Sequence, residues 1–406
     1  MNVIFVEPGF PQYQREFVRA LHAAGAAVIG IGERPAAALD AQLRHWLVQY
    51  EQVESVVDES ALLQAVRATQ RRLWVDRIEA TIEAHILPVA RIREASGIPG
   101  TSVRTAWLCR DKPTMKAALR EAGIPCAQST GAETAAAVWA FAEQVGFPLI
   151  LKPRSGAGAA GTVRVDTTGE LEQALPGYGL NRENSIAVEE FVEGHEGFLD
   201  TISINGAVAH EFISHYYPNV LEAMRSRWIS PQIVATNRLD ASGYDEVRAM
   251  AQRVIKALGI GTSATHMEWF FGPKGLKFSE IGCRPPGVGQ WDVYAAANEF
   301  DIYREWAMAI VHGRTDQPPS RRYACGMIAL RPDRDGRIEG YEGLDQVGRE
   351  CGEHVIAAHL PKPGTPTQPV EAGFMANAWM RVRHPDYDTL RGILDTIGNT
   401  VRVRAA

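Results

Sequence analysis

The chain has 406 residues, of which 46% are hydrophobic and 22% are charged, so a globular protein of two or three packed units is expected. Its formal net charge of −6 argues against a nucleic-acid-binding surface, which would show an excess of Lys and Arg. The cysteines form no C-x-x-C pair and no apolar stretch approaches the ~20 residues that cross a bilayer, so we expect a cytoplasmic protein with no zinc site, no disulfide framework and no membrane partner.

Residues 1–105 alternate between strand and helix patterns. An apolar strand is expected over 3–6, an amphipathic helix over 14–24, and a second strand over 26–32 after Gly25. This order favours a parallel sheet with right-handed crossovers. No G-x-G-x-x-G follows the first strand, so the sheet carries no dinucleotide-binding fingerprint.

A second unit begins near Arg110. Asp111 suits the N-cap of a helix, Pro113 suits its first turn, and Gly123 suits its end. Asn205-Gly206 is a strong signal for a hairpin turn. The hydrophobic spacing predicts helices over 134–145, 244–258, 294–311 and 387–397, and strands over 124–129, 146–153, 162–165, 185–192, 265–271 and 276–282.

Glu268 and Glu280 lie on the two strands that flank the turn GPKG. A three-residue loop over 273–275, with Gly275 in the left-handed conformation, places Glu268 opposite Glu280 and Phe270 opposite Phe278. Two carboxylates facing each other across a sheet repel, and a bridging cation removes the repulsion. Magnesium takes one or two carboxylates together with phosphate oxygens. By themselves the glutamates also fit a solvated surface face, and a two-residue turn would shift the register and separate them.

Lys152 ends an apolar strand and is followed by a loop of small residues. Such residues let backbone N–H groups approach phosphate oxygens, and the loop can close over a nucleotide. No G-K-[ST] ends it, so it is not a Walker A motif, and an ordinary flexible turn is the simpler interpretation of the loop alone. The segment IAVEEFVEGHEG can read a base with its backbone and hold ribose with a carboxylate, although a Glu-rich exposed strand end would look the same.

Taken in this order, the patterns resemble the ATP-grasp superfamily, the fold of biotin carboxylase, D-alanine–D-alanine ligase and glutathione synthetase. The resemblance covers residues 1–313, and the opening VEPGFPQYQREFVRALHAAG and the RPPG after Cys283 are similar to biotin carboxylase-like bacterial members. It implies an α/β fold with α+β elements: an N-terminal parallel-sheet domain preceding the ATP-grasp domain at 1–105, a lid subdomain at 106–190, a metal- and substrate-binding subdomain with an antiparallel sheet at 191–315, and a small C-terminal α+β subdomain at 316–406.

The resemblance implies which residues contact the phosphates of ATP. Lys112 in RDKPTMKAAL resembles the family's first phosphate-contacting lysine. Lys152 in LILKP resembles the second, which touches the α-phosphate and the adenine edge. The small-residue loop is similar to the glycine-rich flap of the family, here represented by Ser155, Gly156, Gly158 and Gly161.

The same resemblance assigns the base, the ribose and the metal. In VEEFVEGHE, Glu189 would lie near the exocyclic amine, the backbone of Glu190 and Val192 would read the base edge, and Glu196 would hold the ribose. Glu268 and Glu280 are similar to the metal ligands for one or two Mg2+ ions. Arg284 is similar to the arginine that stabilises the acyl phosphate, and with Lys152 it forms the predicted catalytic pair.

One position departs from the family pattern E-x-N-x-R, because Gly282 stands where Asn is common. One magnesium ion would then lose a ligand to water or bind more weakly. His266 lies opposite Gly282 in the expected register, but imidazole is a poor magnesium ligand. We therefore expect a packed histidine at this position.

The resemblance implies an ADP-forming, C–N bond-forming ligase that joins a small-molecule carboxylate to an amine through an acyl phosphate. Members of the family frequently form homodimers, although no segment of this sequence marks an interface. A bicarbonate-activating carboxylase is an alternative, but no Met-Lys-Met carrier tripeptide occurs; a non-catalytic ATP-binding regulatory protein is another. Candidate substrate residues, for which a charged surface loop is the competing interpretation, are Tyr216, Tyr217, Arg225, Arg227, Trp228, Gln290, Trp291 and Asp292.

Overall fold

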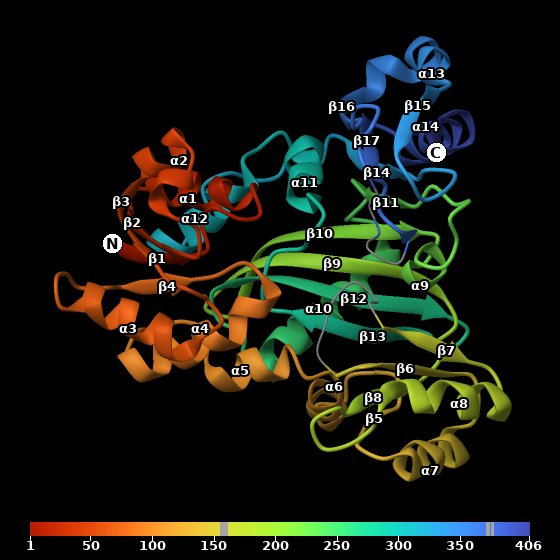
Figure 1. The fold of residues 1–406 in the computed structure, drawn as a ribbon, viewed down its shortest axis with the longest axis horizontal. Helices are drawn as coiled ribbons and strands as arrows, with labels where there is room; N and C mark the ends of the chain where they lie inside the picture. Colours follow the sequence, from red (N-terminus) through yellow and green to blue (C-terminus); the bar gives the residue numbers. More distant parts are fainter. Residues whose placement is uncertain (155–160, 371–373, 375–376) are drawn as a thin grey trace.

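The computed structural model describes residues 1–154, 161–370, 374 and 377–406. Near the N-terminus, a parallel sheet has the strand order β3-β2-β1-β4, which confirms the predicted parallel arrangement (Figure 1). Its strands are β1 (Asn2–Val6), β2 (Ala27–Gly32), β3 (Leu47–Gln52) and β4 (Arg77–Glu79).

Both faces of the parallel sheet are buried, because alternate side chains of β1 enter different hydrophobic layers. Val3 and Phe5 pack with helices α1 (Gln14–Ala23) and α12 (Ile302–His312). Ile4 and Val6 pack on the other side with α3 (Glu59–Gln70) and α4 (Glu83–Ser96). Helix α12 belongs to a distant part of the sequence, so the N-terminal sheet is completed by a later segment (Figure 1).

The central sheet contains eight strands in the order β13-β12-β9-β10-β11-β14-β17-β16, all paired antiparallel. Asn205 and Gly206 join β9 to β10 with φ values of 50° and 84°, as expected for the predicted turn. The strands are β9 (His195–Ile204), β10 (Ala207–Tyr217), β11 (Gln232–Ala235), β12 (Ser263–Gly272), β13 (Gly275–Gly282), β14 (Ala324–Leu330), β16 (Val355–His359) and β17 (Ala378–His384).

The β12–β13 hairpin differs from the prediction and still places the glutamates together. Gly272 pairs with Gly275, so the turn has two residues, whereas a three-residue loop was expected. A register shift then follows between Glu268 and Trp269 and leaves Ser279 outside the pairing. Glu268 therefore does face Glu280. The predicted Phe270–Phe278 pair is wrong, because Phe270 meets Lys277 and Phe278 meets Trp269 on the turn side of the bulge.

A smaller sheet with the strand order β5-β8-β6-β7 lies beside β13 (Figure 1). The strand predicted over 124–129 is wrong: the segment makes a single bridge, from Cys126 to Phe278, and the regular strand starts only at Ser129. Pro125 contributes no N–H to a ladder, and its carbonyl accepts a hydrogen bond from the backbone of Phe278 at 2.8 Å. The elements of this region are β5 (Ser129–Ala132), α7 (Ala135–Val145), β6 (Leu149–Pro153), β7 (Val163–Val165), α8 (Thr168–Ala174) and β8 (Ile186–Glu190).

The helix predicted over 294–311 is two helices. Helix α11 (Gln290–Asn298) ends at Glu299, which has a φ of 55°, and Asp301 then caps α12 by accepting a hydrogen bond from the backbone of Arg304 at 3.1 Å. The break lets α11 lie over the central sheet while α12 packs on the N-terminal one (Figure 1). The remaining helices and strands are α2 (Ala41–Trp46), α5 (Val103–Leu108), α6 (Lys112–Glu121), α9 (Val220–Ala223), α10 (Asp245–Leu258), α13 (Leu344–Cys351), α14 (Tyr387–Thr400), β15 (Ile338–Glu342) and β18 (Arg402–Ala405).

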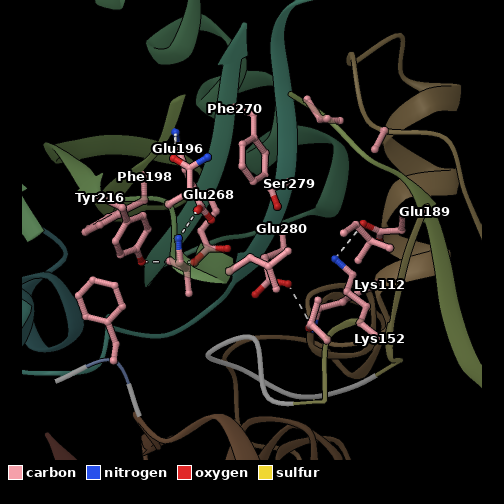
Figure 2. A pocket seen from close by; sticks show the side chains of 18 of the residues that line it. Lys112, Lys152, Glu189, Glu196, Phe198, Tyr216, Glu268, Phe270, Ser279 and Glu280 are labelled. Carbon is pink, nitrogen blue, oxygen red and sulfur yellow. Dashed lines mark hydrogen bonds and ion pairs between the residues drawn. The ribbon is translucent and has the colours of Figure 1, made fainter. Parts of the chain in front are cut away.

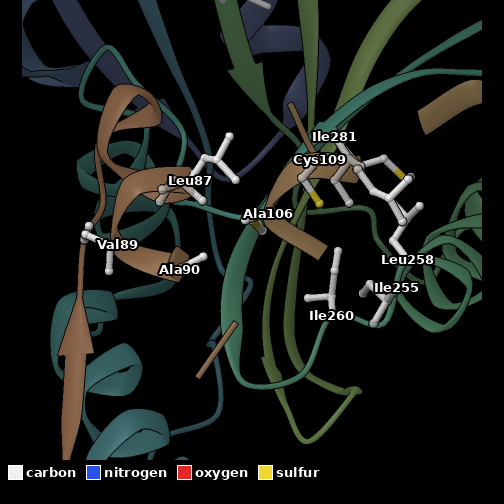
Figure 3. Close-up of a cluster of buried hydrophobic side chains, with 14 of the residues drawn as sticks. Leu87, Val89, Ala90, Ala106, Cys109, Ile255, Leu258, Ile260 and Ile281 are labelled. Atoms are coloured by element: carbon white, nitrogen blue, oxygen red, sulfur yellow. The ribbon is translucent and has the colours of Figure 1, made fainter. Parts of the chain in front are cut away.

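One hydrophobic cluster joins the N-terminal unit to the central sheet. Leu87 of α4, Ala106 of α5, Leu258 of α10 and Ile281 of β13 all belong to it (Figure 3). The hydroxyl of Thr105 also donates to the carbonyl of Leu258 at 3.0 Å. This packing holds the start of α4 near the strand that carries Glu280.

After residue 316, β14, β16 and β17 extend the central sheet, whereas β15 and β18 pair with each other in a separate two-stranded sheet. The subdomain boundaries at 105, 190 and 315 stay a prediction. Within the described ranges, no helix combines the length and apolar character needed to span a membrane.

Candidate active site

A cavity of about 810 Å3 lies between the small sheet, the central sheet and helix α6 (Figure 2). Period-two alternation in the strands decides which side chains reach it. On β9, Glu196 and Phe198 line the cavity, whereas Leu199 packs in the core behind the sheet. On β8, Glu189 lines the cavity, whereas Val188 packs beneath the small sheet.

Glu189 holds two lysines at one end of the cavity. The Nζ atoms of Lys116 and Lys152 lie 2.7 and 2.8 Å from its Oε2 atom, and all three side chains are buried. Burial alone would raise the pKa of Glu189, but Lys116 and Lys152 lower it to about 2. Burial lowers the pKa of Lys116 to about 8 despite Glu189, whereas carboxylates outweigh burial and raise the pKa of Lys152. At pH 7 this end therefore carries two cations around one anion.

Lys116 was not among the predicted site residues, although the sequence contained a signal for it. It follows Lys112 by four residues on α6, a spacing that places both on one face of a helix. The Nζ atom of Lys112 lies 3.2 Å from Oε2 of Glu280. Helix α6 begins as predicted, with the side chain of Asp111 accepting a hydrogen bond from the backbone of Thr114.

Glu268 and Glu280 face each other across β12 and β13, and both line the cavity (Figure 2). Burial would raise the pKa of Glu280, but Lys112 and then Lys152 lower it, so this carboxylate is ionised. In the part of the chain that the structure describes, no group of three or more His, Cys, Asp or Glu side chains could hold a metal ion. The two glutamates fit magnesium shared with a nucleotide, because such an ion takes its remaining ligands from phosphate oxygens and water.

His266 is a cation beside Glu268. Its Nδ1 atom lies 2.7 Å from Asp200 and its Nε2 atom 3.4 Å from Glu268. Burial would lower the pKa of His266, but Asp200 and then Glu268 raise it to about 10. The other oxygen of Asp200 accepts a hydrogen bond from Tyr294 of α11 at 2.5 Å. Both ring nitrogens of His266 therefore carry protons at pH 7, which leaves no lone pair for a metal ion.

Arg284 lines the cavity and is held by a carboxylate from the N-terminal unit. Its Nε atom lies 2.7 Å from Oε2 of Glu83, the first residue of α4. Arg110 lies 3.7 Å from the other oxygen of Glu83. Burial would lower the pKa of Arg284, but Glu83 outweighs burial and raises it. Glu83 was missed by the sequence reasoning, because it is separated from Arg284 by 201 positions.

The space beside Gly282 is filled by this ion pair. A Cβ atom on Gly282 would lie 3.3 Å from Oε2 of Glu83 and 3.4 Å from Cγ of Arg284. The Cβ atom alone would make these side chains shift by a few tenths of an ångström, and an asparagine adds further atoms. The glycine that departs from the E-x-N-x-R pattern therefore lies directly against the ion pair between Glu83 and Arg284.

Glu196 is buried, and its Oε2 atom accepts a hydrogen bond from the backbone of Val220 at 2.7 Å. Burial, and then the charge of Glu268, raises the pKa of Glu196 to about 8. Glu190 and Val192 line the same cavity. Of the predicted loop, Gly161 lies outside the cavity lining and has a φ of 68°, whereas Ser155, Gly156 and Gly158 lie outside the described residues.

Tyr216, Arg225 and Gln290 line the cavity, and their contact with a substrate stays a prediction. The hydroxyl of Tyr216 donates to Oε1 of Glu268 at 3.4 Å. The side chain of Gln290 donates to Ser214 at 3.0 Å and so joins α11 to the floor of the cavity.

The cavity lining does not include three further residues predicted from the same segment. Tyr217 lies on the opposite face of β10 from Tyr216, and its hydroxyl contacts that of Tyr387 at 2.9 Å. Arg227 forms an ion pair with Asp335 at 2.7 Å. Trp228 is 83% exposed. Sequence proximity to Tyr216 was therefore a poor guide to their positions.

Two residues predicted from α11 also point elsewhere. Trp291 is buried against Phe17 of the N-terminal unit, with ring centroids 5.0 Å apart. Asp292 lies 3.1 Å from Arg381 of β17. These corrections follow from the helix, because Gln290 turns toward the sheet while its two successors lie on other faces.

A family model described as the ATP-grasp domain matches residues 117–300. This chain contains an ATP-grasp domain. The matched segment includes Lys152, Glu189 and both opposed glutamates, and Lys112 lies just before it.

The sequence of the chain is also similar to that of a named ligase. An L-arginine-specific L-amino acid ligase from Bacillus subtilis is 27% identical over 251 residues, which cover 60% of this chain and 60% of the ligase. The chain spans about three fifths of the length of the curated relatives it matches first.

Two solved structures share the ATP-grasp fold over the whole chain. The crystal structure of an L-amino acid ligase from Bacillus licheniformis has a TM-score of 0.79 at 18% identity and covers 100% of this chain and 98% of its own. A biotin carboxylase domain dimer from Hydrogenobacter thermophilus, in complex with ADP, magnesium and bicarbonate, has a TM-score of 0.66 at 16% identity, with coverages of 99% and 90%. The fold predicted for this chain is thereby confirmed.

Proposed function

We propose that this protein is an ATP-dependent carboxylate–amine ligase that forms an amide or peptide-like bond through an acyl phosphate and releases ADP and phosphate. The observation that carries the proposal is the opposition of Glu268 and Glu280 between the lysine end of the cavity and Arg284. Such a site can bring phosphate groups and a carboxylate together while stabilising their negative charge. The ligase names of two similar proteins support the same reaction class.

The lysine end is the proposed nucleotide site. Lys112 and Lys152 would contact the phosphates, and Glu196 would hold the ribose. Oε1 of Glu189 is buried and has no hydrogen-bond partner among the described residues, so it is suited to accept the exocyclic amine of adenine. The backbone of Glu190 and Val192 would read the base edge. We keep the loop residues Ser155, Gly156, Gly158 and Gly161 as the proposed cover over the phosphates.

Glu268 and Glu280 would hold one or two Mg2+ ions together with ATP. Magnesium, when bound, neutralises phosphate charge during the transfer. Titration of activity with magnesium at fixed ATP would separate one ion from two, because a second essential ion makes the dependence sigmoidal. Asp200 and Tyr294 keep His266 oriented beside Glu268, which limits the freedom of that carboxylate.

In the proposed reaction, an oxygen of the substrate carboxylate attacks the γ-phosphorus. The bond from this phosphorus to the β,γ-bridging oxygen breaks, ADP leaves, and a carboxyl phosphate forms. Arg284 and Lys152 stabilise the charge on the transferring group. The amine nitrogen then attacks the carbonyl carbon, the phosphate leaves, and the nitrogen gives up a proton. Exclusion of water protects the mixed anhydride between the two steps.

Phosphate release should be measured with Mg-ATP across panels of carboxylic acids and amines, with product identification by mass spectrometry. The proposal requires release that depends on an acid and an amine together, and a product whose mass is the sum of both less one water. Release that depends on bicarbonate alone would assign a carboxylase. ATP binding without turnover across the panels would indicate a regulatory ATP-binding protein.

A further inference from the structure

The cavity continues past Glu268, away from the lysines, into an end walled by apolar side chains (Figure 2). The rings of Phe198 and Tyr216 have centroids 4.9 Å apart, and Phe374 lies 5.6 Å from Tyr216. Ile233 pairs with Tyr216 in the neighbouring strand and lines the same space. We call these four residues, Phe198, Tyr216, Ile233 and Phe374, the aromatic end.

Three of the four residues of the aromatic end lie on the central sheet. Phe198, Tyr216 and Ile233 are 1%, 7% and 2% exposed and come from the adjacent strands β9, β10 and β11. Phe198 is directly opposite Glu268 in the β9–β12 pairing. An apolar wall therefore begins one strand away from a carboxylate of the reaction centre.

The four side chains offer no charge to a ligand. The hydroxyl of Tyr216 donates to Oε1 of Glu268 at 3.4 Å, so the phenol keeps its proton. A carboxylate entering this end would lie near Glu268 without a cation from these walls, and an ammonium group would lose its water without a matching anion on any of the four side chains.

We propose that the aromatic end binds the side chain of the carboxylate substrate and that this side chain is a branched aliphatic or aromatic group. The inference rests on the proposed function, because it takes the reacting carboxylate to lie beside Glu268 and Arg284. The substituent next to such a carboxylate has the aromatic end as its neighbouring volume. Its burial removes apolar surface from water, whereas a polar substituent would leave hydrogen bonds unmade.

The test uses the full chain with Mg-ATP and hydroxylamine, which traps a carboxyl phosphate as a hydroxamate and makes the identity of the natural amine irrelevant. The acids compared are L-leucine, L-phenylalanine, L-alanine, L-serine and L-aspartate. The kcat/KM for L-leucine or L-phenylalanine should exceed that for L-alanine by about tenfold or more, since one methylene in an apolar pocket discriminates on this scale. A preference for L-serine would overturn the inference. A preference for L-aspartate would also overturn it, and would point to Arg225, an exposed cation of the lining with no acidic partner among the described residues.

Ile233→Phe fills the aromatic end and should reduce the ratio of kcat/KM between L-phenylalanine and L-alanine by about tenfold. Tyr217→Phe is the matched control, because Tyr217 is on the opposite face of β10, and it should keep the ratio of the parent. Ile233→Val changes the side-chain volume less and is the second variant to measure should Ile233→Phe fail to fold. It should raise the ratio of kcat/KM between L-phenylalanine and L-alanine. ADP binding by calorimetry reports folding independently of turnover.

Failure of this inference and failure of the proposed function give different results. Hydroxamate from small or polar acids only, or a ratio unchanged in Ile233→Phe, would overturn the aromatic end as the side-chain site and leave the ligase intact. Hydroxamate from no acid, while ADP still binds, would overturn the proposed function and the inference together.

Discussion

Gly282→Asn is expected to lower activity, because the space beside the glycine holds the ion pair between Glu83 and Arg284. A Cβ atom there would lie 3.3 Å from the Glu83 carboxylate and 3.4 Å from Arg284. Asparagine adds further atoms beyond Cβ, so the guanidinium or the carboxylate must move. The family pattern suggests the opposite result, since an asparagine at this position would supply a missing magnesium ligand.

The magnitude follows from the contacts that are disturbed. A hydrogen bond to a charged partner contributes about 1.5–3 kcal/mol. Overpacking at a filled site costs about 1–3 kcal/mol, part of which the surrounding structure absorbs. If the displaced Arg284 is needed in the transition state, a loss of about 1.5–3 kcal/mol corresponds to a fall in kcat/KM of about 10- to 150-fold.

The assay is hydroxamate formation at saturating Mg-ATP, with the magnesium dependence measured for each variant. Glu83→Gln should reproduce most of the loss, because it removes the charge that holds Arg284 while keeping the side-chain shape. The double variant should lose less than the sum of the two single losses, since both act on one ion pair. Gly282→Ala, which adds only Cβ, should fall between the parent and Gly282→Asn. A Gly282→Asn variant that is as active as the parent, or that requires less magnesium, would contradict this prediction, provided that the parent and the variant bind ADP equally.

Lys116→Met is expected to weaken ADP binding and to lower the free energy of unfolding by on the order of 1–3 kcal/mol, because Glu189 would keep only Lys152 as an ion-pair partner. Calorimetry measures the ADP binding and urea unfolding the stability, and unchanged values would contradict this prediction. Glu280→Gln should abolish acid-dependent ATP turnover while magnesium-free ADP binding persists, and unchanged turnover would show that the metal assignment is wrong. Burial raises the pKa of Glu196 from 4.5 to about 8 in the folded state, so the stability that its proton adds is fully present below pH 4.5 and is lost as the pH rises through about 8. Urea unfolding without nucleotide should show a steeper decline between these pH values in the parent than in Glu196→Gln, and equal slopes would refute the assignment.

The register of the two glutamates shows how far turn chemistry could be read from the sequence. Gly275 was placed correctly in the left-handed conformation, with a φ of 72°. The loop length was wrong by one residue, and the bulge at Ser279 shifts the register by one residue in the opposite direction. The two offsets cancel at Glu268 and Glu280. A bulge has no strong local signature, so its position depends on the strands that pack around it.

The structure places more of the residues predicted for the nucleotide than of those predicted for the substrate in the cavity, for a physical reason. Lys152 and Glu189 lie on neighbouring buried strands, where alternation decides their direction. The same rule applied to β10 would have separated Tyr216 from Tyr217. Trp228 follows β10 in a segment with no regular period, so its exposure could not be deduced from the residues beside it.

The pair between Glu83 and Arg284 could not be inferred from the sequence, because it depends on how the N-terminal unit packs on the central sheet. That packing is maintained by the hydrophobic cluster that includes Leu87 and Ile281 (Figure 3). Leu87 lies one helical turn after Glu83 on α4, so the residues that bury α4 also set the position of its carboxylate. Substitutions in this cluster should therefore lower kcat through Arg284 even though they contact no substrate. We therefore expect the proposed reaction centre to be complete only while the two units remain docked.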